Sequence, residues 1–124
     1  MTYQPPNATV WSEIPVTDLD ASSDFYARVT GLVLHRTDDG PNPMATFVSV
    51  QGGVAGHLYP GKPAQDGEGP TIHLAAEGTL EDVITRVWDA GGHVLSEPIN
   101  IPAGRFIYCK DLDGNSIGLF ERAA

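Results

Sequence analysis

The chain has 124 residues, of which 41% are hydrophobic and 19% are charged, and this composition is typical of one folded globular domain. No apolar run approaches the roughly 20 residues of a membrane-spanning helix, and residues 1–7 are too polar for a signal peptide. The single cysteine, Cys109, has no partner for an internal disulfide. We therefore expect a cytoplasmic protein in a reducing compartment that makes no membrane contact.

The net charge of the chain limits the classes of partner that it is expected to bind. Sixteen acidic residues against seven basic ones leave a net charge of -9, and the sequence contains no cluster of Lys or Arg. Such a chain repels phosphate backbones, so we expect no nucleic-acid partner. An acidic surface promotes solubility and also attracts cationic ligands, which leaves a small molecule as the expected partner.

The first half of the chain predicts one strand, one helix and three more strands. Residues 10–16 are short, apolar and β-branched, which is typical of a strand. Asp18 is placed to cap the following helix, because its carboxylate can accept from the free N–H groups of the first turn. Apolar residues then recur at helical spacing until Gly31, which is typical of a left-handed C-terminal cap. The three further strands are expected at residues 33–36, 46–50 and 54–59.

The second half repeats this order after a Gly- and Pro-rich linker at about residues 60–70. Residues 71–75 predict a strand, and Thr79 is placed to cap a second helix that ends at Gly91 and Gly92. Asp113, Gly114 and Asn115 predict a hairpin turn that needs positive φ angles. The remaining strands are expected at residues 94–95, 106–110 and 116–121.

An internal duplication accounts for this repetition. A fixed offset of 61 residues pairs Gly31 with Gly92, Val33 with Val94, Leu34 with Leu95, Phe47 with Tyr108, and Leu58 with Leu119. Each half therefore has the order strand, helix, strand, strand, strand. We predict a single α+β domain of two tandem βαβββ modules, the first at about residues 8–60 and the second at about residues 71–122.

The local sequence resembles the vicinal oxygen chelate superfamily, the group of glyoxalases and bleomycin-resistance proteins. Residues 11–20, followed by Phe25, Tyr26 and Gly31, are similar to its opening strand and helix. Residues 90–95 and 111–119 are similar to its second-half signature. The resemblance spans roughly residues 9–121. It implies an open, mixed β-barrel that encloses a cavity for small molecules, and often a homodimer that completes the cavity.

The resemblance also implies up to four metal-ligand positions, on the first and last strand of each module. In this chain they hold Trp11, His57, Thr71 and Gly118. Of these only His57 is a competent ligand for a divalent metal. We therefore expect no metal cofactor at the usual site, although Glu13, His57 and His73 leave a displaced divalent-metal site as an alternative.

Alternation along the predicted strands places Glu13 on the same face as Trp11, and His73 on the same face as Thr71. Glu13 is the candidate general base, with His57, His73 and Tyr108 as candidate catalytic partners. The candidate substrate-binding residues are Trp11, Phe47, Thr71, Phe106 and Phe120. Together they predict an aromatic pocket with a few titratable groups, as in many small-molecule sites.

Three functions fit this pocket. The leading hypothesis is a metal-independent acid/base enzyme of isomerase, epimerase, cyclase or lyase type, acting on an oxygenated metabolite. The second is a sequestering protein of the bleomycin-resistance kind, whose acidic, aromatic groove holds a cationic drug. The third is a divalent-metal enzyme with displaced ligands. The fold alone does not choose among them.

Overall fold

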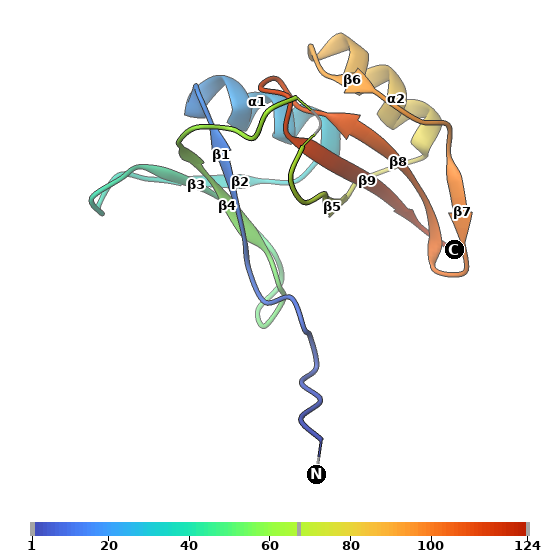
Figure 1. Ribbon diagram of the computed structural model, residues 1–124, viewed down its shortest axis with the longest axis horizontal. Helices are drawn as coiled ribbons and strands as arrows, with labels where there is room; N and C mark the ends of the chain where they lie inside the picture. The colour runs from blue at the N-terminus through green and yellow to red at the C-terminus, as the bar shows by residue number, and fades with distance from the viewer. Residues whose placement is uncertain (1, 67, 124) are drawn as a thin grey trace.

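A computed structural model describes residues 2–66 and 68–123, in which each half of the chain forms a sheet with one helix packed against it (Figure 1). The first half contains β1 (Ser12–Val16), α1 (Leu19–Thr30), β2 (Leu34–Thr37), β3 (Met44–Phe47) and β4 (Gly56–Pro60). The second half contains β5 (Ile72–Ala75), α2 (Leu80–Asp89), β6 (His93–Val94), β7 (Ile99–Ile101), β8 (Gly104–Lys110) and β9 (Ser116–Arg122).

Both sheets are mixed and share one topology. In the first, the order is β1-β4-β3-β2, with β1 parallel to β4 and the other pairs antiparallel. In the second, the order is β5-β9-β8-β6, with β5 parallel to β9 and β7 paired to β8. The predicted α+β class is confirmed. The sheets are open in the single chain, however, so the expected barrel is not closed by the described residues.

The helix boundaries follow from local capping chemistry. Asp18 accepts a hydrogen bond from the backbone N–H of Ala21 at 3.0 Å, and Gly31 ends α1 with a φ of 80°. Thr79 accepts from the N–H of Asp82 at 3.3 Å at the start of α2. These interactions satisfy N–H groups that a helix leaves unpaired, and the left-handed cap suits glycine because it lacks a Cβ. The predicted N-terminal caps of both helices and the glycine cap of α1 are confirmed, whereas α2 ends at Asp89, with Ala90 as its C-terminal cap ahead of Gly91.

The two helices cover one face of the sheets, and the core lies beneath them. Phe25, Tyr26 and Val29 of α1 are buried there. The corresponding face of α2 is also apolar, with Leu80 and Val83 fully buried. Neither helix is long and apolar enough to cross a membrane within the described residues. The opposite face of each sheet carries no helix, and this face holds most of the predicted site.

The strands differ from expectation at two places. The third strand was expected at residues 46–50, whereas β3 begins and ends earlier, at Met44–Phe47. The short strand β7 was not predicted at all, because Pro98 and Pro102 flank its three residues and indicate a loop. It pairs with the first part of β8 and extends the hairpin at that end of the sheet.

A buried carboxylate links the two modules. Asp111, which is 3% exposed, accepts from the Tyr26 hydroxyl at 2.6 Å through one oxygen. Its other oxygen accepts from the backbone N–H groups of Asp113 and Asn115, each at 2.9 Å. The side-chain amide of Asn115 in turn donates to the carbonyl oxygen of Pro15 at 2.8 Å. We call Tyr26, Asp111, Asn115 and the Pro15 carbonyl the inter-module clasp.

The clasp predicts a loss of stability at alkaline pH. Burial, together with the Asp111 carboxylate, raises the pKa of the Tyr26 phenol well above its ordinary value of 10.0. Above about pH 10 the unfolded chain releases this proton and the folded chain retains it, so stability is lost as the pH rises. Removing the hydroxyl in Tyr26→Phe should cost about 1.5–3 kcal/mol at pH 7, as for a hydrogen bond to a charged group, and should make the alkaline loss shallower.

Urea unfolding between about pH 7 and pH 11 measures both effects. Tyr3→Phe is the matched control, since Tyr3 is 87% exposed. Burial also raises the pKa of the Cys109 thiol to about 12, so some alkaline loss remains in every variant, and the difference between wild type and Tyr26→Phe isolates the phenol. Identical pH profiles for these two proteins would contradict the clasp.

Candidate functional site

The uncovered faces of the two sheets carry the polar and aromatic residues of the candidate site. On the first sheet, the parallel register sets Glu13 of β1 directly beside His57 of β4. On the second sheet, His73 of β5, Gly118 of β9 and Tyr108 of β8 form one row across three strands. Each sheet thus contributes one wall of the candidate site. The first wall carries a carboxylate beside an imidazole, and the second carries aromatic rings.

The first wall is built around a buried imidazole. His57 accepts at Nδ1 from the indole N–H of Trp11 at 3.0 Å, and its Nε2 lies 3.2 Å from Oε1 of Glu13. The His57 side chain is only 11% exposed, whereas that of Glu13 is 65% exposed and faces open space. We call these three residues the Trp–His–Glu chain. It presents one exposed carboxylate with a buried imidazole nitrogen 3.2 Å from one of its oxygens.

The second wall is a cluster of rings that we call the aromatic wall, made of His73, Phe106, Tyr108 and Phe120. The imidazole of His73 meets the Phe106 ring edge-on with centroids 4.9 Å apart, and Phe106 meets Tyr108 in the same way at 5.3 Å. Phe106 and Phe120 stack in parallel at 6.3 Å. Edge-to-face and offset contacts of this kind hold the rings in place and leave flat surface for a ligand.

His73 takes its position because Gly118 has no side chain. The imidazole lies directly over Gly118, so that a Cβ at this position would collide with the ring. At the next pair along the strands, the hydroxyls of Thr71 and Ser116 are hydrogen-bonded at 2.5 Å. The positions where the resemblance implies the third and fourth metal ligands are therefore filled by contacts within the sheet.

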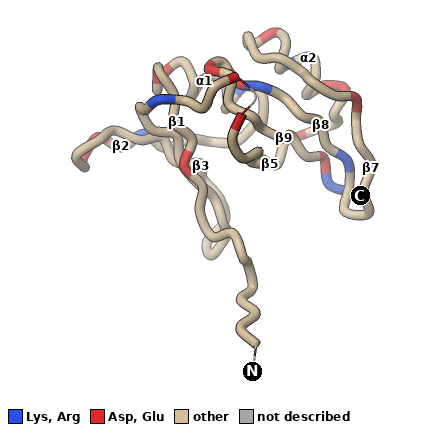
Figure 2. The backbone as a smooth tube through the Cα atoms, in the orientation of Figure 1, with Lys and Arg blue, Asp and Glu red and all other residues tan. Residues whose placement is uncertain are grey.

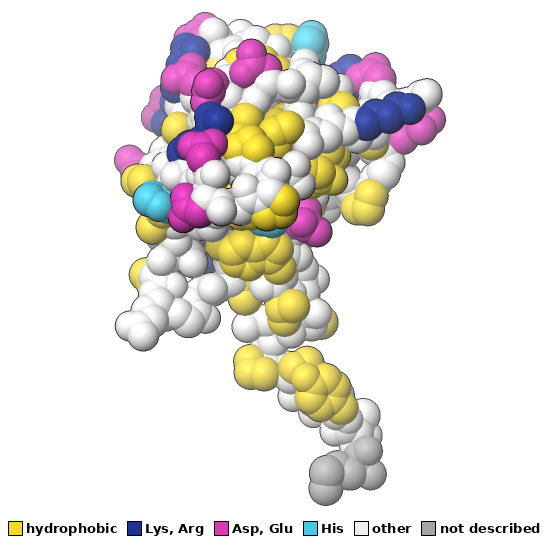
Figure 3. Space-filling model, turned by 90° about the vertical axis from the view of Figure 1, so that its left-hand side faces the viewer, with side chains coloured by type: hydrophobic (Ala, Val, Ile, Leu, Met, Phe, Trp, Pro, Cys, Tyr) yellow, Lys and Arg dark blue, Asp and Glu magenta, His cyan; other side chains and the backbone are white. Residues whose placement is uncertain are grey.

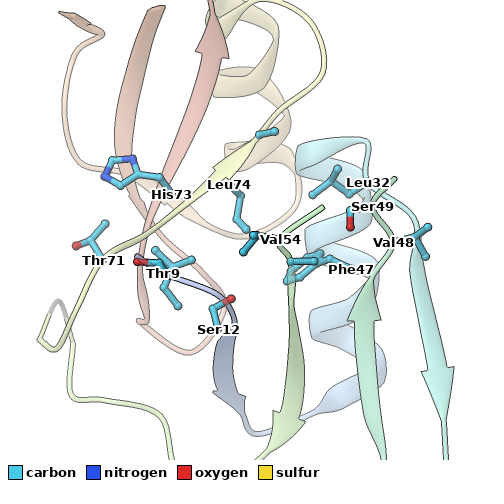
Figure 4. A pocket seen from close by; sticks show the side chains of 13 residues that line it. Thr9, Ser12, Leu32, Phe47, Val48, Ser49, Val54, Thr71, His73 and Leu74 are labelled. Atoms are coloured by element: carbon cyan, nitrogen blue, oxygen red, sulfur yellow. The ribbon is translucent and has the colours of Figure 1, made fainter. Parts of the chain in front are cut away.

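A hollow of about 510 Å³ lies between β5 and the end of β3 with the loop that follows it. In Figure 4, Leu74 points toward Phe47 and Val54, whereas Thr71 and His73 point away from them. Apolar side chains therefore line the interior of this hollow, and the two polar residues stand at its edge.

A smaller hollow of about 350 Å³ adjoins the Trp–His–Glu chain. Glu13 lines it together with Lys62 and Glu68 of the linker, Asn115 of the β8–β9 turn and Ser116 at the start of β9. The linker is held in place by an ion pair between Asp66 and Lys110 at 2.8 Å. Glu13 thus lines a space of the size that a small metabolite needs.

Two features of the predicted pocket need correction. Phe47 was expected in one cavity wall with His57, but it is 4% exposed, packs edge-on against Tyr26, and lines the larger hollow instead of the wall that carries His57. The sheet registers explain the error, because Thr46 pairs with His57 and Tyr108 pairs with Gly118. The two modules therefore correspond with an offset of 62 residues at β3 and β8, and a slip of one residue reverses the face of a strand.

The second correction concerns the expected meeting of Glu13 with both histidines. Glu13 contacts His57, whereas His73 belongs to the other sheet and contacts Phe106 and Tyr108. Arg105 forms ion pairs with Glu81 and Glu121 and leaves Glu13 to His57. The roles expected for the site residues remain predictions, and Phe47 lines the larger hollow whereas the others lie on the two sheets: Trp11, Glu13, His57, Thr71, His73, Phe106, Tyr108 and Phe120.

The residues at the implied metal positions do not fit a divalent metal. Trp11 occupies the lone pair at Nδ1 of His57 with its indole N–H, and the Thr71 hydroxyl is hydrogen-bonded to Ser116. Among the described residues, no group of three His, Cys, Asp or Glu side chains lies close enough to hold a metal. A metal needs free lone pairs that converge on one point, and these side chains do not offer them.

Charged and apolar side chains are unevenly distributed over the surface around the two walls. Acidic and basic side chains lie along the helices, loops and strand ends, whereas the N-terminal segment before β1 carries none (Figure 2). Exposed apolar side chains appear on the face shown in Figure 3 and along this segment. They include Val10 and Trp11, which are 68% and 46% exposed. Cys109 points into the core, where its raised pKa makes it a poor nucleophile.

Sequence reasoning missed several residues of the site. It did not predict the bond between Trp11 and His57, which are 46 residues apart, or the pairing of Thr71 with Ser116. It also missed Lys62 and Glu68, since linker composition alone gives no sign that these residues border a hollow. A signal was available only for Ser116, which shares a strand face with Gly118 by simple alternation.

Comparison with solved structures supports the fold. The chain is similar to hypothetical protein SA1046 from S. aureus, with 23% identity, a TM-score of 0.66, and coverage of 93% of this chain and 96% of the other. It is similar to the antibiotic-binding protein TnmS3 from a Streptomyces species, with 23% identity, a TM-score of 0.64, and coverage of 97% and 100%. Identities below 25% establish the fold alone.

A third similar structure is the fosfomycin resistance protein FosX from Listeria monocytogenes, solved with Mn(II) and sulfate. Identity is 16%, the TM-score is 0.69, and 97% of this chain and 95% of the other are covered. No curated protein matches the chain. The family model of the Glyoxalase/Bleomycin resistance protein/Dioxygenase superfamily matches residues 8–119, and the chain therefore belongs to this superfamily.

Proposed function

We propose that this protein is a metal-independent acid/base enzyme that acts on a small oxygenated molecule, with Glu13 as the general base. The observation that supports the proposal is the Trp–His–Glu chain, in which a buried imidazole lies 3.2 Å from the carboxylate of Glu13, a residue that lines a hollow of about 350 Å³. A positioned carboxylate beside a ligand space is the arrangement that proton transfer requires.

The proposed step is abstraction of a proton from a carbon next to a carbonyl group. Glu13 takes the proton, the C–H electrons form the C=C bond of an enolate, and the carbonyl oxygen receives the negative charge. The Tyr108 hydroxyl of the aromatic wall, brought opposite Glu13 by a second copy of the chain, would donate a hydrogen bond to that oxygen. Return of the proton from Glu13 to the same or a neighbouring carbon completes an epimerisation or isomerisation, and expulsion of a leaving group gives a lyase reaction.

The proposal includes a homodimer in which a second copy completes the cavity. Both sheets are open, and their uncovered faces and edges leave large apolar side chains exposed. Trp11, Tyr108 and Leu95 are 46%, 38% and 53% exposed, respectively. A second copy would cover this surface and place the aromatic wall of one chain opposite the Trp–His–Glu chain of the other, closing the barrel expected from the superfamily.

Sequestration of a small molecule is the second candidate function. The aromatic wall favours it, because stacked and edge-on rings bind flat ligands without any need for titratable groups. The net charge of -9 would assist the capture of a cation. The related protein TnmS3 is described as binding an antibiotic. A displaced metal site and a cytosolic location remain predictions without a further observation in their favour.

Replacement of Glu13 by Gln provides the direct test of the base. The amide keeps the shape of the side chain and loses its basicity, so proton abstraction should fall by about 100-fold or more. The measurement is exchange of carbon-bound protons in D2O, followed by proton NMR, across a panel of small 2-oxo and 2-hydroxycarbonyl compounds. The melting temperature should stay nearly unchanged, since the Glu13 side chain is 65% exposed.

Glu68→Gln is the matched control, because Glu68 lines the same hollow outside the Trp–His–Glu chain. It should retain exchange within a few-fold of wild type. Full activity in Glu13→Gln would remove Glu13 as the base. Tight binding of panel compounds without any exchange in wild type would instead favour sequestration.

Mixing two inactive variants tests whether the cavity is shared. Glu13→Gln and Tyr108→Phe alter opposite walls, so a mixed dimer would carry one cavity with both changes and one cavity with neither. Mixing should therefore restore up to about one quarter of the wild-type exchange rate, and sedimentation should give about twice the 13.2 kDa chain mass. A monomer, or a mixture as inactive as its components, would refute the shared cavity.

A further inference from the structure

Trp11 occupies the first metal-ligand position of the superfamily, and its indole N–H is bonded to His57, which occupies the second. A bond between these two positions gives Trp11 a role beyond that of a substrate-binding surface. We propose that Trp11 is a positioning residue that holds His57 in a single neutral tautomer, so that His57 in turn holds Glu13. An internal hydrogen-bonded chain would then take the place that a metal has in metal-dependent relatives.

The tautomer follows from the hydrogen-bonding capacity of each group. An indole N–H can only donate, so Nδ1 of His57 must be the acceptor and carries no proton. The proton of the neutral ring is then on Nε2, which lies 3.2 Å from Oε1 of Glu13. An ionised carboxylate can only accept, so all three groups are satisfied in one arrangement.

The surroundings of His57 leave little alternative to this arrangement. Its side chain is 11% exposed, so water has limited access to the ring nitrogens. The Tyr59 ring lies edge-on at 6.0 Å, and the parallel pairing of β1 with β4 fixes Glu13 opposite the imidazole. Trp11 is thus the group among these neighbours that meets Nδ1.

This arrangement changes the role expected for His57. Its only acceptor lone pair is used by Trp11, so it cannot serve as a base while that bond is made. It acts instead as a donor that holds one oxygen of Glu13, which leaves the other oxygen of the carboxylate to meet a ligand proton. The pattern resembles an oriented base with a supporting partner, in which the third group sets the tautomer of the second.

The test reads the tautomer directly, in solution and without a substrate. Protein labelled with 15N at histidine and tryptophan is studied by long-range proton–nitrogen NMR at about pH 8.5, about two units above the ordinary histidine pKa of about 6.5. In wild type, His57 should show a protonated Nε2 and an unprotonated Nδ1. A scalar coupling between Trp11 Nε1 and His57 Nδ1 should also cross the hydrogen bond. A protonated Nδ1 in wild type would overturn the proposal, and so would the absence of this coupling.

Trp11→Phe removes the donor and keeps an aromatic ring. His57 should then populate both neutral tautomers, whereas Trp88→Phe, which alters a tryptophan packed on His93, should leave His57 unchanged. A dispersed amide spectrum establishes that each variant is folded. An unchanged His57 tautomer in folded Trp11→Phe would refute the positioning role. If that variant does not fold, the presence or absence of the Trp11–His57 coupling in wild type decides whether the hydrogen bond exists.

The expected effect of Trp11 on catalysis rests on the proposed function and is measured separately from the tautomer, through the kinetics of proton exchange. If Glu13 is the base, Trp11→Phe should lower kcat for proton exchange by about 100-fold, the loss that a small misplacement of a catalytic group can cause. A rise in KM alone would assign Trp11 to ligand contact and contradict its positioning role. No exchange in wild type, together with the expected tautomer, would defeat the proposed function and leave the role of Trp11 standing.

Discussion

The architecture depends on one buried carboxylate. Asp111 lies in the turn that follows β8, and its two oxygens bind the Tyr26 hydroxyl and the backbone of its own turn. A charge removed from water is costly unless hydrogen bonds surround it, so the two modules must meet in the one arrangement that supplies them. Asn115 completes the link by donating to the carbonyl of Pro15 in β1, the strand that also carries Glu13. The clasp thereby holds β1 against the second module.

The site follows from what this fold does with its metal positions. The parallel pairing of β1 with β4 places Glu13 beside His57, and Trp11 reaches the far side of the same imidazole. On the other sheet, Gly118 leaves room that the His73 ring fills. At the positions where the resemblance implies metal ligands, Trp11 is hydrogen-bonded to His57 and Thr71 to Ser116. The superfamily scaffold is kept, and the proposed chemistry uses a carboxylate beside an imidazole in place of a Lewis acid.

Local chemistry explains which features could be predicted from sequence. Asp18 and Thr79 cap their helices through neighbours three residues away, so the helix starts were predictable. The face of Phe47 was not, because the offset between the modules slips by one residue at β3. The bond from Trp11 to His57 depends on strand register across 46 residues, which composition and periodicity do not encode. The same holds for barrel closure, which is proposed to need a second chain.

Metal content tests most directly the proposal that the Trp–His–Glu chain takes the place of a metal ion. Protein purified without an affinity tag would be measured by inductively coupled plasma mass spectrometry, after incubation with zinc, nickel, manganese or iron and removal of the excess. We predict far less than one metal ion per chain for each element. Near-stoichiometric metal in wild type that disappears in Glu13→Ala would contradict the account and identify a displaced metal centre at this carboxylate.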